Sequence, residues 1–228
     1  MIILGIETST SLGSIAFFDS DENRVLGQLA VDIRAAHSEK LVPYIDFLLS
    51  ESRTQKEDIN LVAVSRGPGS FTGLRVGVST AKGFALALSV PVIGIDSLMA
   101  CAFPYLAEGN RVAALFDAKR GEVFGAVYGE SEYGIPHTVL EPKINKINDF
   151  IDNCIIQNVS LYTGDIYRDS IMRFLPPQAP RVEAGFERPN AISTAVIGHR
   201  KFADSGEDNL SDLSPEYLRN FIPGKPRC

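Results

Sequence analysis

Five consecutive polar residues follow the first apolar segment of the chain: Glu7, Thr8, Ser9, Thr10 and Ser11. The hydroxyl and backbone N–H groups of such a loop can hold a phosphate, and a carboxylate beside them can orient a hydrated magnesium ion. The same composition also suits a hydroxyl-rich hairpin loop that binds nothing. These residues are therefore the candidate phosphate- or nucleotide-binding loop.

A glycine turn is the second candidate. Gly67 and Gly69 permit backbone conformations that are closed to other residues, and Pro68 restricts the bend between them. A helix that begins after such a turn presents free N–H groups to an anion. The next glycine is Gly73 and no Gly-Lys-Ser/Thr follows, so neither G-x-G-x-x-G nor a P-loop is present. A plain strand-to-helix turn is the alternative.

Small residues recur every four positions in the helix expected after this turn, at Gly73, Gly77, Ala81 and Ala85. Positions four apart lie on one helix face. Each interior glycine costs a helix about 1 kcal/mol relative to alanine, so a compensating contact is expected. We expect this face to pack closely against another helix, either of this chain or of a partner.

Other catalytic patterns are missing from the sequence. The three histidines, at positions 37, 137 and 199, are too far apart for a metal-binding motif, and no G-x-S-x-G nucleophile motif occurs. Asp117 precedes Arg120 at the end of an apolar segment, where the pair is either an active carboxylate with its partner or a simple ion pair in a turn. The residues thus offer neither a histidine metal-binding motif nor a serine-nucleophile motif.

Composition narrows the class of protein. The 228 residues are 45% hydrophobic and 22% charged, with a formal net charge of −6, so binding nucleic acid alone is not expected. The three cysteines form no C-x-x-C pair, which favours a reducing compartment. No signal peptide or membrane span is indicated, and we expect a cytoplasmic protein.

The pattern of apolar residues predicts two α/β units. Strands are expected at Ile2–Glu7, Ser14–Asp19 and Arg24–Asp32, then an amphipathic helix at Ser38–Arg53 and a strand at Ile59–Val64. The glycine turn, its helix and a strand at Val92–Ile95 follow. A strand, polar turn and strand then recur at Val112–Asp117 and Glu122–Tyr128, which suggests a duplicated architecture. Further helices are expected near Asn145–Ile155, Tyr167–Leu175 and Ala191–Ala203, with a strand near Ser160–Thr163.

Five segments resemble the TsaB (YeaZ) family. They are Ile3–Ser9, Ala63–Gly77 with its GPGSFTGLR motif, Ala81–Gly83, Asp117–Val123 and the closing Pro215–Arg219. The resemblance implies the fold shared by actin, sugar kinases and heat-shock chaperones, with two similar subdomains that each hold a mixed sheet flanked by helices. We place an N-terminal subdomain at 1–107 and a smaller, degenerate one at 108–228.

The resemblance implies a role in forming N6-threonylcarbamoyladenosine next to the anticodon of tRNA. Family members are non-catalytic subunits that pair with the paralogue TsaD and are joined by TsaE, and they form homodimers when alone. ATP is used by the complex, with no cofactor held by this chain alone, and tRNA is contacted mainly through the complex. The two metal-binding histidines of TsaD correspond to Ser97 and Cys101, which argues against a metal site.

The resemblance also implies that the pairing surface lies on helices of the first subdomain. The residues expected there are Leu41, Ile45, Ser70, Phe71, Gly73, Leu74, Gly77, Val78 and Ala81. Two enzymatic alternatives remain open at this point. One is a metal-dependent glycoprotease-like peptidase, and the other is a free-standing actin-like ATPase or kinase that uses the loop after Glu7.

Overall fold

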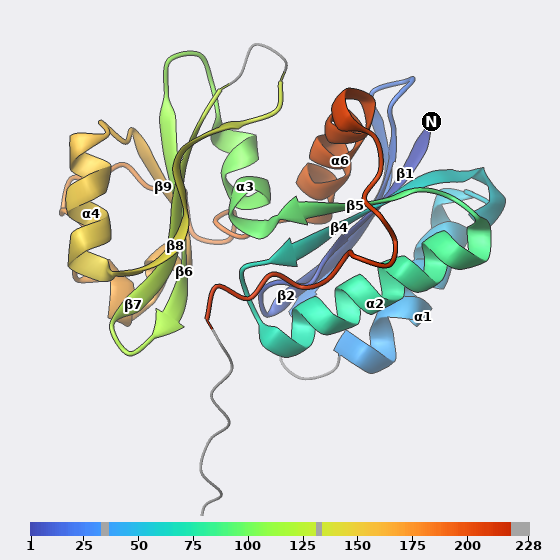
Figure 1. The fold of residues 1–228 in the computed structure, drawn as a ribbon, viewed down its shortest axis with the longest axis horizontal. Helices are drawn as coiled ribbons and strands as arrows, with labels where there is room; N and C mark the ends of the chain where they lie inside the picture. Colours follow the sequence, from blue (N-terminus) through green and yellow to red (C-terminus); the bar gives the residue numbers. More distant parts are fainter. Residues whose placement is uncertain (33–36, 131–133, 220–228) are drawn as a thin grey trace, which may run out of the picture.

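The computed structural model describes residues 1–32, 37–130 and 134–219, with the side chains of residues 37–39 left aside. Two sheets lie side by side (Figure 1). The first has five strands in the order β3-β2-β1-β4-β5, and β1 pairs antiparallel with β2 and parallel with β4. Its strands are β1 (Ile2–Glu7), β2 (Leu12–Asp19), β3 (Arg24–Asp32), β4 (Ile59–Gly67) and β5 (Val92–Asp96).

The second sheet repeats this arrangement with four strands in the order β8-β7-β6-β9. Here β6 pairs antiparallel with β7 and parallel with β9, as β1 does with β2 and β4. Its strands are β6 (Arg111–Lys119), β7 (Glu122–Gly129), β8 (His137–Lys146) and β9 (Leu161–Gly164). The predicted fold class, two similar units each with a mixed sheet flanked by helices, is confirmed.

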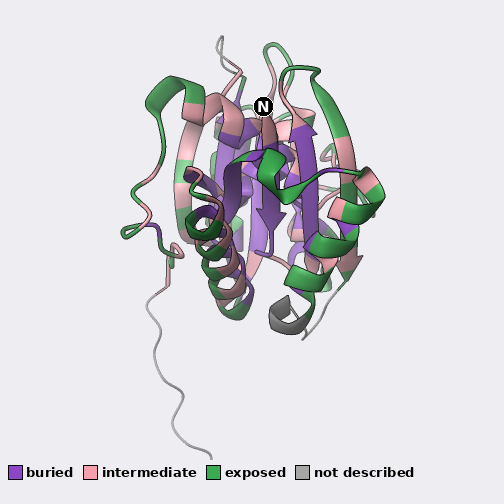
Figure 2. Ribbon diagram, turned by 90° about the vertical axis from the view of Figure 1, so that its right-hand side faces the viewer, coloured by how far each residue is buried: buried purple, intermediate pink, exposed green. Residues whose placement is uncertain are grey.

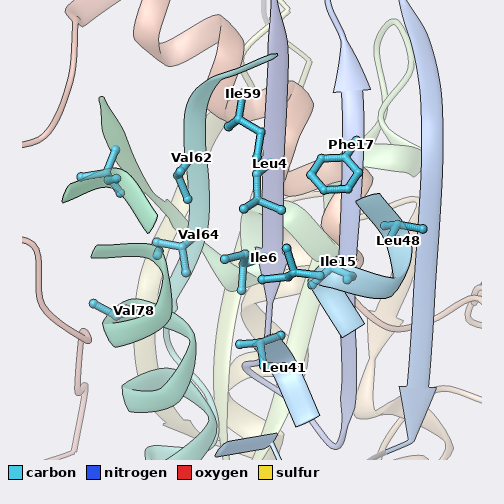
Figure 3. Close-up of a cluster of buried hydrophobic side chains, with 14 of the residues drawn as sticks. Leu4, Ile6, Ile15, Phe17, Leu41, Leu48, Ile59, Val62, Val64 and Val78 are labelled. Atoms are coloured by element: carbon cyan, nitrogen blue, oxygen red, sulfur yellow. The ribbon is translucent and has the colours of Figure 1, made fainter. Parts of the chain in front are cut away.

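Helices α1 (His37–Ser52) and α2 (Phe71–Leu88) cover one face of the first sheet, and α6 (Ala191–Ser205) covers the other. Alternation along the strands assigns side chains to these two faces. Leu4 and Ile6 of β1 pack with α1 and α2 (Figure 3), whereas Ile3 packs with α6. Burial is concentrated in the strands, and the outer surfaces of the helices stay exposed (Figure 2).

The second sheet carries shorter helices. Helix α4 (Ile147–Ile156) packs on its outer side through Phe150 and Ile151, and α3 (Ser97–Ala102) lies between the two sheets. The remaining short elements are α5 (Asp169–Met172) and the 3-10 turns η1 (Lys56–Asp58), η2 (Phe103–Tyr105) and η3 (Asp165–Tyr167). Among the described residues, no helix combines the length and apolar character that crossing a bilayer requires.

The predicted domain boundary needs a correction. The two sheets do divide near residue 107, but residues 190–219 return to the first sheet instead of completing the second. Helix α6 packs so closely that a Cβ on Gly5 would overlap the Ala191 carbonyl oxygen, and one on Gly198 would overlap Ala63. Among the described residues, the first domain therefore consists of residues 1–32, 37–96 and 190–219, and the second of residues 97–130 and 134–189.

Strand β8 was not predicted from the sequence. It is an edge strand that pairs with β7 alone in the second sheet, and it contains Pro142 and three lysine or glutamate side chains among its exposed or half-buried positions. Proline and charged residues are typical of sheet edges, where a strand need not follow apolar alternation. Conversely, the helix expected at Tyr167–Leu175 is reduced to a 3-10 turn and a four-residue helix.

Candidate functional site

A cavity of about 320 Å³ lies where the two domains face each other. The first domain contributes the loop Ser9–Ser11 and the turn residues Gly69 and Ser70, and the second contributes residues 116–119 with Asp165 and Arg168. The loop after β1 and the hairpin after β6 occupy equivalent positions in the two repeated units. This cavity is the candidate ligand site of the chain.

The glycine turn shapes the first wall of this cavity. The amide of Ser70 donates to the Ser9 carbonyl at 2.7 Å, and a Cβ on Gly69 would lie only 2.8 Å from the Cβ of Ser9. Ser70 is also the N-cap of α2, because its hydroxyl accepts a hydrogen bond from the Gly73 amide at 3.3 Å. The turn therefore packs on the polar loop and starts α2 at the cavity.

Glu7 does not line the cavity. It is fully buried and accepts hydrogen bonds from the Ser9 amide at 2.6 Å and from the Ser65 hydroxyl, which lies 3.2 Å from the hydroxyl of Thr194. Burial raises the pKa of Glu7, and its hydrogen bonds with Ser65 and Ser9 oppose that rise. The expectation that Glu7 orients a magnesium ion is therefore wrong, since its carboxylate serves the internal structure.

Thr8 is likewise buried, and its hydroxyl donates to the Gly73 carbonyl of α2 at 2.8 Å. Ser9 lines the cavity with only 2% exposure, while Thr10 and Ser11 are half-buried. The Ser11 hydroxyl accepts a hydrogen bond from Arg188 at 2.6 Å. Of the five residues in the candidate phosphate loop, Ser9, Thr10 and Ser11 are therefore the ones that can meet a ligand.

Ion pairs form the second wall of the cavity. Lys119 Nζ lies 2.8 Å from Asp117 Oδ2, and Arg168 lies 3.0 Å from Asp165 and 3.8 Å from Asp117. Burial alone would raise the pKa of Asp117, but hydrogen bonds from Lys119 and the charge of Arg168 bring it below its ordinary value. Asp117 is thus an ionised carboxylate in an ion pair. Its partners are Lys119 and Arg168, and not Arg120, which the sequence suggested.

The small-residue face of α2 contacts the chain's own loop, which corrects the expectation that it packs on another helix. A Cβ on Gly73 would overlap the Thr8 carbonyl oxygen, and one on Gly77 would overlap the Thr8 hydroxyl. Ala81 and Ala85 continue the same face into the apolar core of the first domain. The glycines are required because α2 crosses the end of β1 at backbone distance.

Most of the predicted pairing residues are buried inside the first domain and cannot meet a partner. Gly73 and Gly77 contact Thr8, and the others that are buried, each 3% exposed or less, are Leu41, Ile45, Leu74, Val78 and Ala81. Ser70 is exposed at the cavity, and Phe71 is half-buried beneath Tyr217, with ring centroids 4.8 Å apart. These side chains belong to the inward faces of α1 and α2, because apolar periodicity marks the stripe that a helix buries in its own domain.

The outward side of these two helices carries a groove of about 690 Å³ that sequence reasoning missed. Val42 of α1 and Thr80, Gly83, Phe84 and Ala87 of α2 line it. Val42 is 44% exposed, and Phe47 on the same helix is 54% exposed. The available signal was the presence of large apolar residues away from the buried stripe.

Ser97 and Cys101, which the family resemblance equates with two metal-binding histidines, are both buried in α3. The Cys101 thiol lies 3.1 Å from the Glu187 carbonyl oxygen, and burial raises its pKa far above that of a free thiol. A thiol that stays protonated is a poor metal ligand. Within residues 1–32, 37–130 and 134–219, no three His, Cys, Asp or Glu side chains gather as potential metal ligands. Cys228 lies outside the described residues.

Comparisons with known proteins find similarity to proteins of tRNA threonylcarbamoyladenosine formation. Residues 31–160 match the family model described as TsaD: tRNA N6-adenosine threonylcarbamoyltransferase. The tRNA threonylcarbamoyladenosine biosynthesis protein TsaB of Escherichia coli K12 is 37% identical, with 99% of this chain and 97% of that protein aligned. The protein of the same name from Bacillus subtilis is 32% identical over 96% of this chain and 94% of its own length.

Solved structures show the same fold. The crystal structure of an uncharacterized Pseudomonas aeruginosa protein, described as similar to peptidase YEAZ, superposes with a TM-score of 0.80 at 23% identity. It covers 96% of this chain and 99% of its own. A structure described as YeaZ from the same organism has a TM-score of 0.77 at 22% identity, covering 95% and 99%.

Proposed function

The chain belongs to the TsaB family of tRNA threonylcarbamoyladenosine biosynthesis proteins, and we propose that it acts there as a non-catalytic subunit. Its partner is a TsaD-type transferase, with which it promotes formation of N6-threonylcarbamoyladenosine in tRNA. The match over nearly the full length of two TsaB proteins carries this proposal. A subunit of this kind works where tRNA is modified, in the cytoplasm.

The chemistry of the described side chains supports a non-catalytic role. The carboxylates at the cavity are engaged by Lys119 and Arg168, and Glu7 is sealed inside the first domain. The position where the paralogue holds a metal has a buried serine and a protonated thiol, Ser97 and Cys101, whose donor set does not fit a metal ion. These residues also make the metallopeptidase alternative a poor fit.

The groove between α1 and α2 is the proposed pairing surface. It is open, largely apolar and lined by side chains that the first domain leaves uncovered, among them Val42, Phe84 and Ala87. Apolar surface of this kind is typical of protein interfaces. We assign it to TsaD in the complex and to a second copy when the chain is alone. TsaE joins the pair, ATP is used by the complex, and tRNA is contacted mainly through the complex.

Reconstitution tests the proposal. Purified TsaC, TsaD, TsaE, threonine, bicarbonate, ATP and unmodified tRNA are combined with and without this chain, and modified adenosine is measured by mass spectrometry. We expect the product to fall to background when the chain is omitted. Full product without it would contradict the proposal, as would stoichiometric iron or zinc on the purified chain or cleavage of a glycoprotein by it.

The residues Ser9, Thr10 and Ser11 remain our candidate phosphate contacts at the cavity. Their support is geometric, since they face it from the first domain while Lys119 and Arg168 face it from the second. Titrating ATP with magnesium into the isolated chain by calorimetry tests this, with Ser11→Val as the variant and Ser79→Val on the exposed side of α2 as the control. Steady ATP hydrolysis by the chain alone would favour the kinase or ATPase alternative.

A further inference from the structure

The last described segment, residues 206–219, runs from the end of α6 across the first domain (Figure 1). Asp208 anchors its start, because its amide donates to the Val92 carbonyl at 3.0 Å and its carboxylate accepts from the Gly94 amide at 2.6 Å. Leu213 is 3% exposed within the apolar core, and Lys82 of α2 donates to its carbonyl at 3.1 Å. This part of the segment is firmly attached to the first domain.

The segment next crosses the glycine turn. The Glu216 amide donates to the Arg66 carbonyl at 2.7 Å, and the Glu216 carboxylate lies 3.5 Å from the Arg66 guanidinium. Gly67 has a φ of +131°, and a Cβ there would lie 2.5 Å from the Glu216 carbonyl oxygen. A glycine is therefore needed at position 67 both for its backbone conformation and for the passage of this segment.

Tyr217 then packs on the first turn of α2, next to the interdomain cavity. Its ring packs on Phe71 at 4.8 Å between centroids, and its hydroxyl accepts from Arg75 Nε at 3.1 Å. Phe71 directly follows Ser70, which lines the cavity. The aromatic contact thus fixes the segment at the wall that the first domain supplies.

Arg219 contacts the second domain. Its guanidinium pairs with the carboxylate of Glu122, the first residue of β7. Glu122 is the strand partner of Lys119, which lines the cavity from the second domain. Residues 217–219 therefore connect α2 of the first domain with β7 of the second, beside Ser70 and Lys119, which line the cavity. The contact with the second domain is an ion pair whose side chains are 35% and 36% exposed.

We propose that residues 217–219 act as a latch between the two domains, beside the interdomain cavity. The Arg219–Glu122 ion pair holds the two domains together at this edge, and its release lets the cavity open while residues 208–216 stay on the first domain. An ion pair this exposed is weak and is screened by salt. The apolar contact of the buried Leu213 is not screened by salt, so it holds the segment on the first domain. The latch thus controls how readily a small polar molecule reaches Ser9, independently of any partner protein.

Thiol labelling of the isolated full-length chain tests the latch. Ser9→Cys places a near-isosteric reporter at a cavity position that is 2% exposed. Cys101 and Cys154 are buried, and Cys228→Ser removes the remaining thiol. We expect Arg219→Ala to speed labelling of the reporter by a soluble disulfide reagent about two- to fivefold at low salt, and 0.5 M salt to do the same when Arg219 is intact.

The exchanged pair Arg219→Glu with Glu122→Arg should restore slow labelling, which a general loss of stability cannot explain. Lys56→Ala removes one partner of an exposed ion pair with Glu57, remote from the cavity, and should leave the rate unchanged. Equal labelling rates with and without Arg219, with no response to salt, overturn the proposal. So does an exchanged pair that labels as fast as Arg219→Ala while melting at the temperature of the parent.

Discussion

The inward and outward faces of helix α2 both carry small and apolar residues, but they meet different surroundings. On the inward face, Gly73 and Gly77 lie against Thr8, so closely that a Cβ on either residue would overlap it. On the outward face, Gly83 has no atom within 4 Å of its Cβ position, and it lines an open groove with Phe84. The two faces have similar residues, but the inward face is in close contact with the chain's own loop and the outward face is open.

This difference shows that a row of small residues indicates a close contact but does not identify the contacting group. Small residues allow close approach, but the approaching group at Gly77 is the chain's own loop after β1, and the pairing surface has to be sought on the other side. The same contact explains why the polar loop keeps its place. Thr8 is held by α2, and this sets Ser9, Thr10 and Ser11 at the edge of the cavity.

The largest effect is expected from Gly77→Leu on the inward face. The new side chain has to displace Thr8 or lift α2 from the sheet, so we expect a loss of at least about 3 kcal/mol in the free energy of unfolding. Chemical denaturation of the isolated chain measures it, with Gly77→Ala as a smaller step. A normally folded monomer that fails only to pair with TsaD would show that this face is the partner surface after all.

A pH dependence is expected for Asp96, which ends β5 on the inner side of the structure. Burial raises its pKa to about 6, while its carboxylate caps α3 by accepting from the Met99 amide at 2.9 Å. Because the pKa of Asp96 is higher in the folded than in the unfolded chain, folding favours its protonated form. The contribution of Asp96 to the free energy of unfolding is therefore fully present below about pH 4 and is lost as the pH rises through about 6.

An asparagine side chain at this position would keep the cap without ionising. We therefore expect the free energy of unfolding of Asp96→Asn to rise by about 2 kcal/mol relative to that of the parent between pH 4 and pH 7. This is somewhat less than the whole pKa difference would give, because the Asp96 side chain retains contact with water. Urea unfolding at the two pH values measures the difference. An exposed substitution in α2, such as Ser79→Ala, should show no such change, and a pH-independent gap for Asp96→Asn would contradict the burial of its charge.

Sequence reasoning was most successful where a segment buries one face. The strands β1 and β3 match their predicted bounds, and β4 and α2 were expected at the glycine turn, because alternating or helical apolar patterns record burial directly. It failed where long-range contacts decide the outcome. The local sequence of Ala191–Ser205 does not indicate that this helix returns to the first sheet. Edge strand β8 has no fully buried face, so its sequence shows no alternation of apolar and polar residues.

The candidate site was only partly predictable for the same reason. The sequence identified the loop Glu7–Ser11 and the hairpin at Asp117, which do meet at one cavity. It could not show that Glu7 turns inward to Ser65 and Ser9, since that depends on the packing of β1 between β2 and β4. The contact of residues 217–219 with both domains could not be predicted either, because Tyr217 is far in sequence from Phe71 and Arg219 is far from Glu122.

A charge on the outward face should impair pairing without affecting the fold. Ala87 is exposed and lines the groove, so Ala87→Glu places a carboxylate where an apolar partner surface would bury it. We expect a loss of about 2 kcal/mol in binding to TsaD, roughly thirtyfold in Kd, with an unchanged melting temperature. Ser79→Glu on the same helix, away from the groove, is the control, and equal affinity for both variants would remove the groove from the interface.

The smallest expected effect has the opposite sign. Gly83 lies in the interior of α2 with free space at its Cβ position, so Gly83→Ala adds a helix-favouring residue and displaces nothing. We expect a gain of about 0.5–1 kcal/mol in the free energy of unfolding, against a loss for Gly77→Ala in the same helix. Comparing the free energies of unfolding of the two variants therefore distinguishes the open face of α2 from the face in close contact. The comparison is made in dilute, monomeric sample, because the homodimer that we propose through the groove would cover Gly83. A loss at both glycines under these conditions would contradict an open outward face.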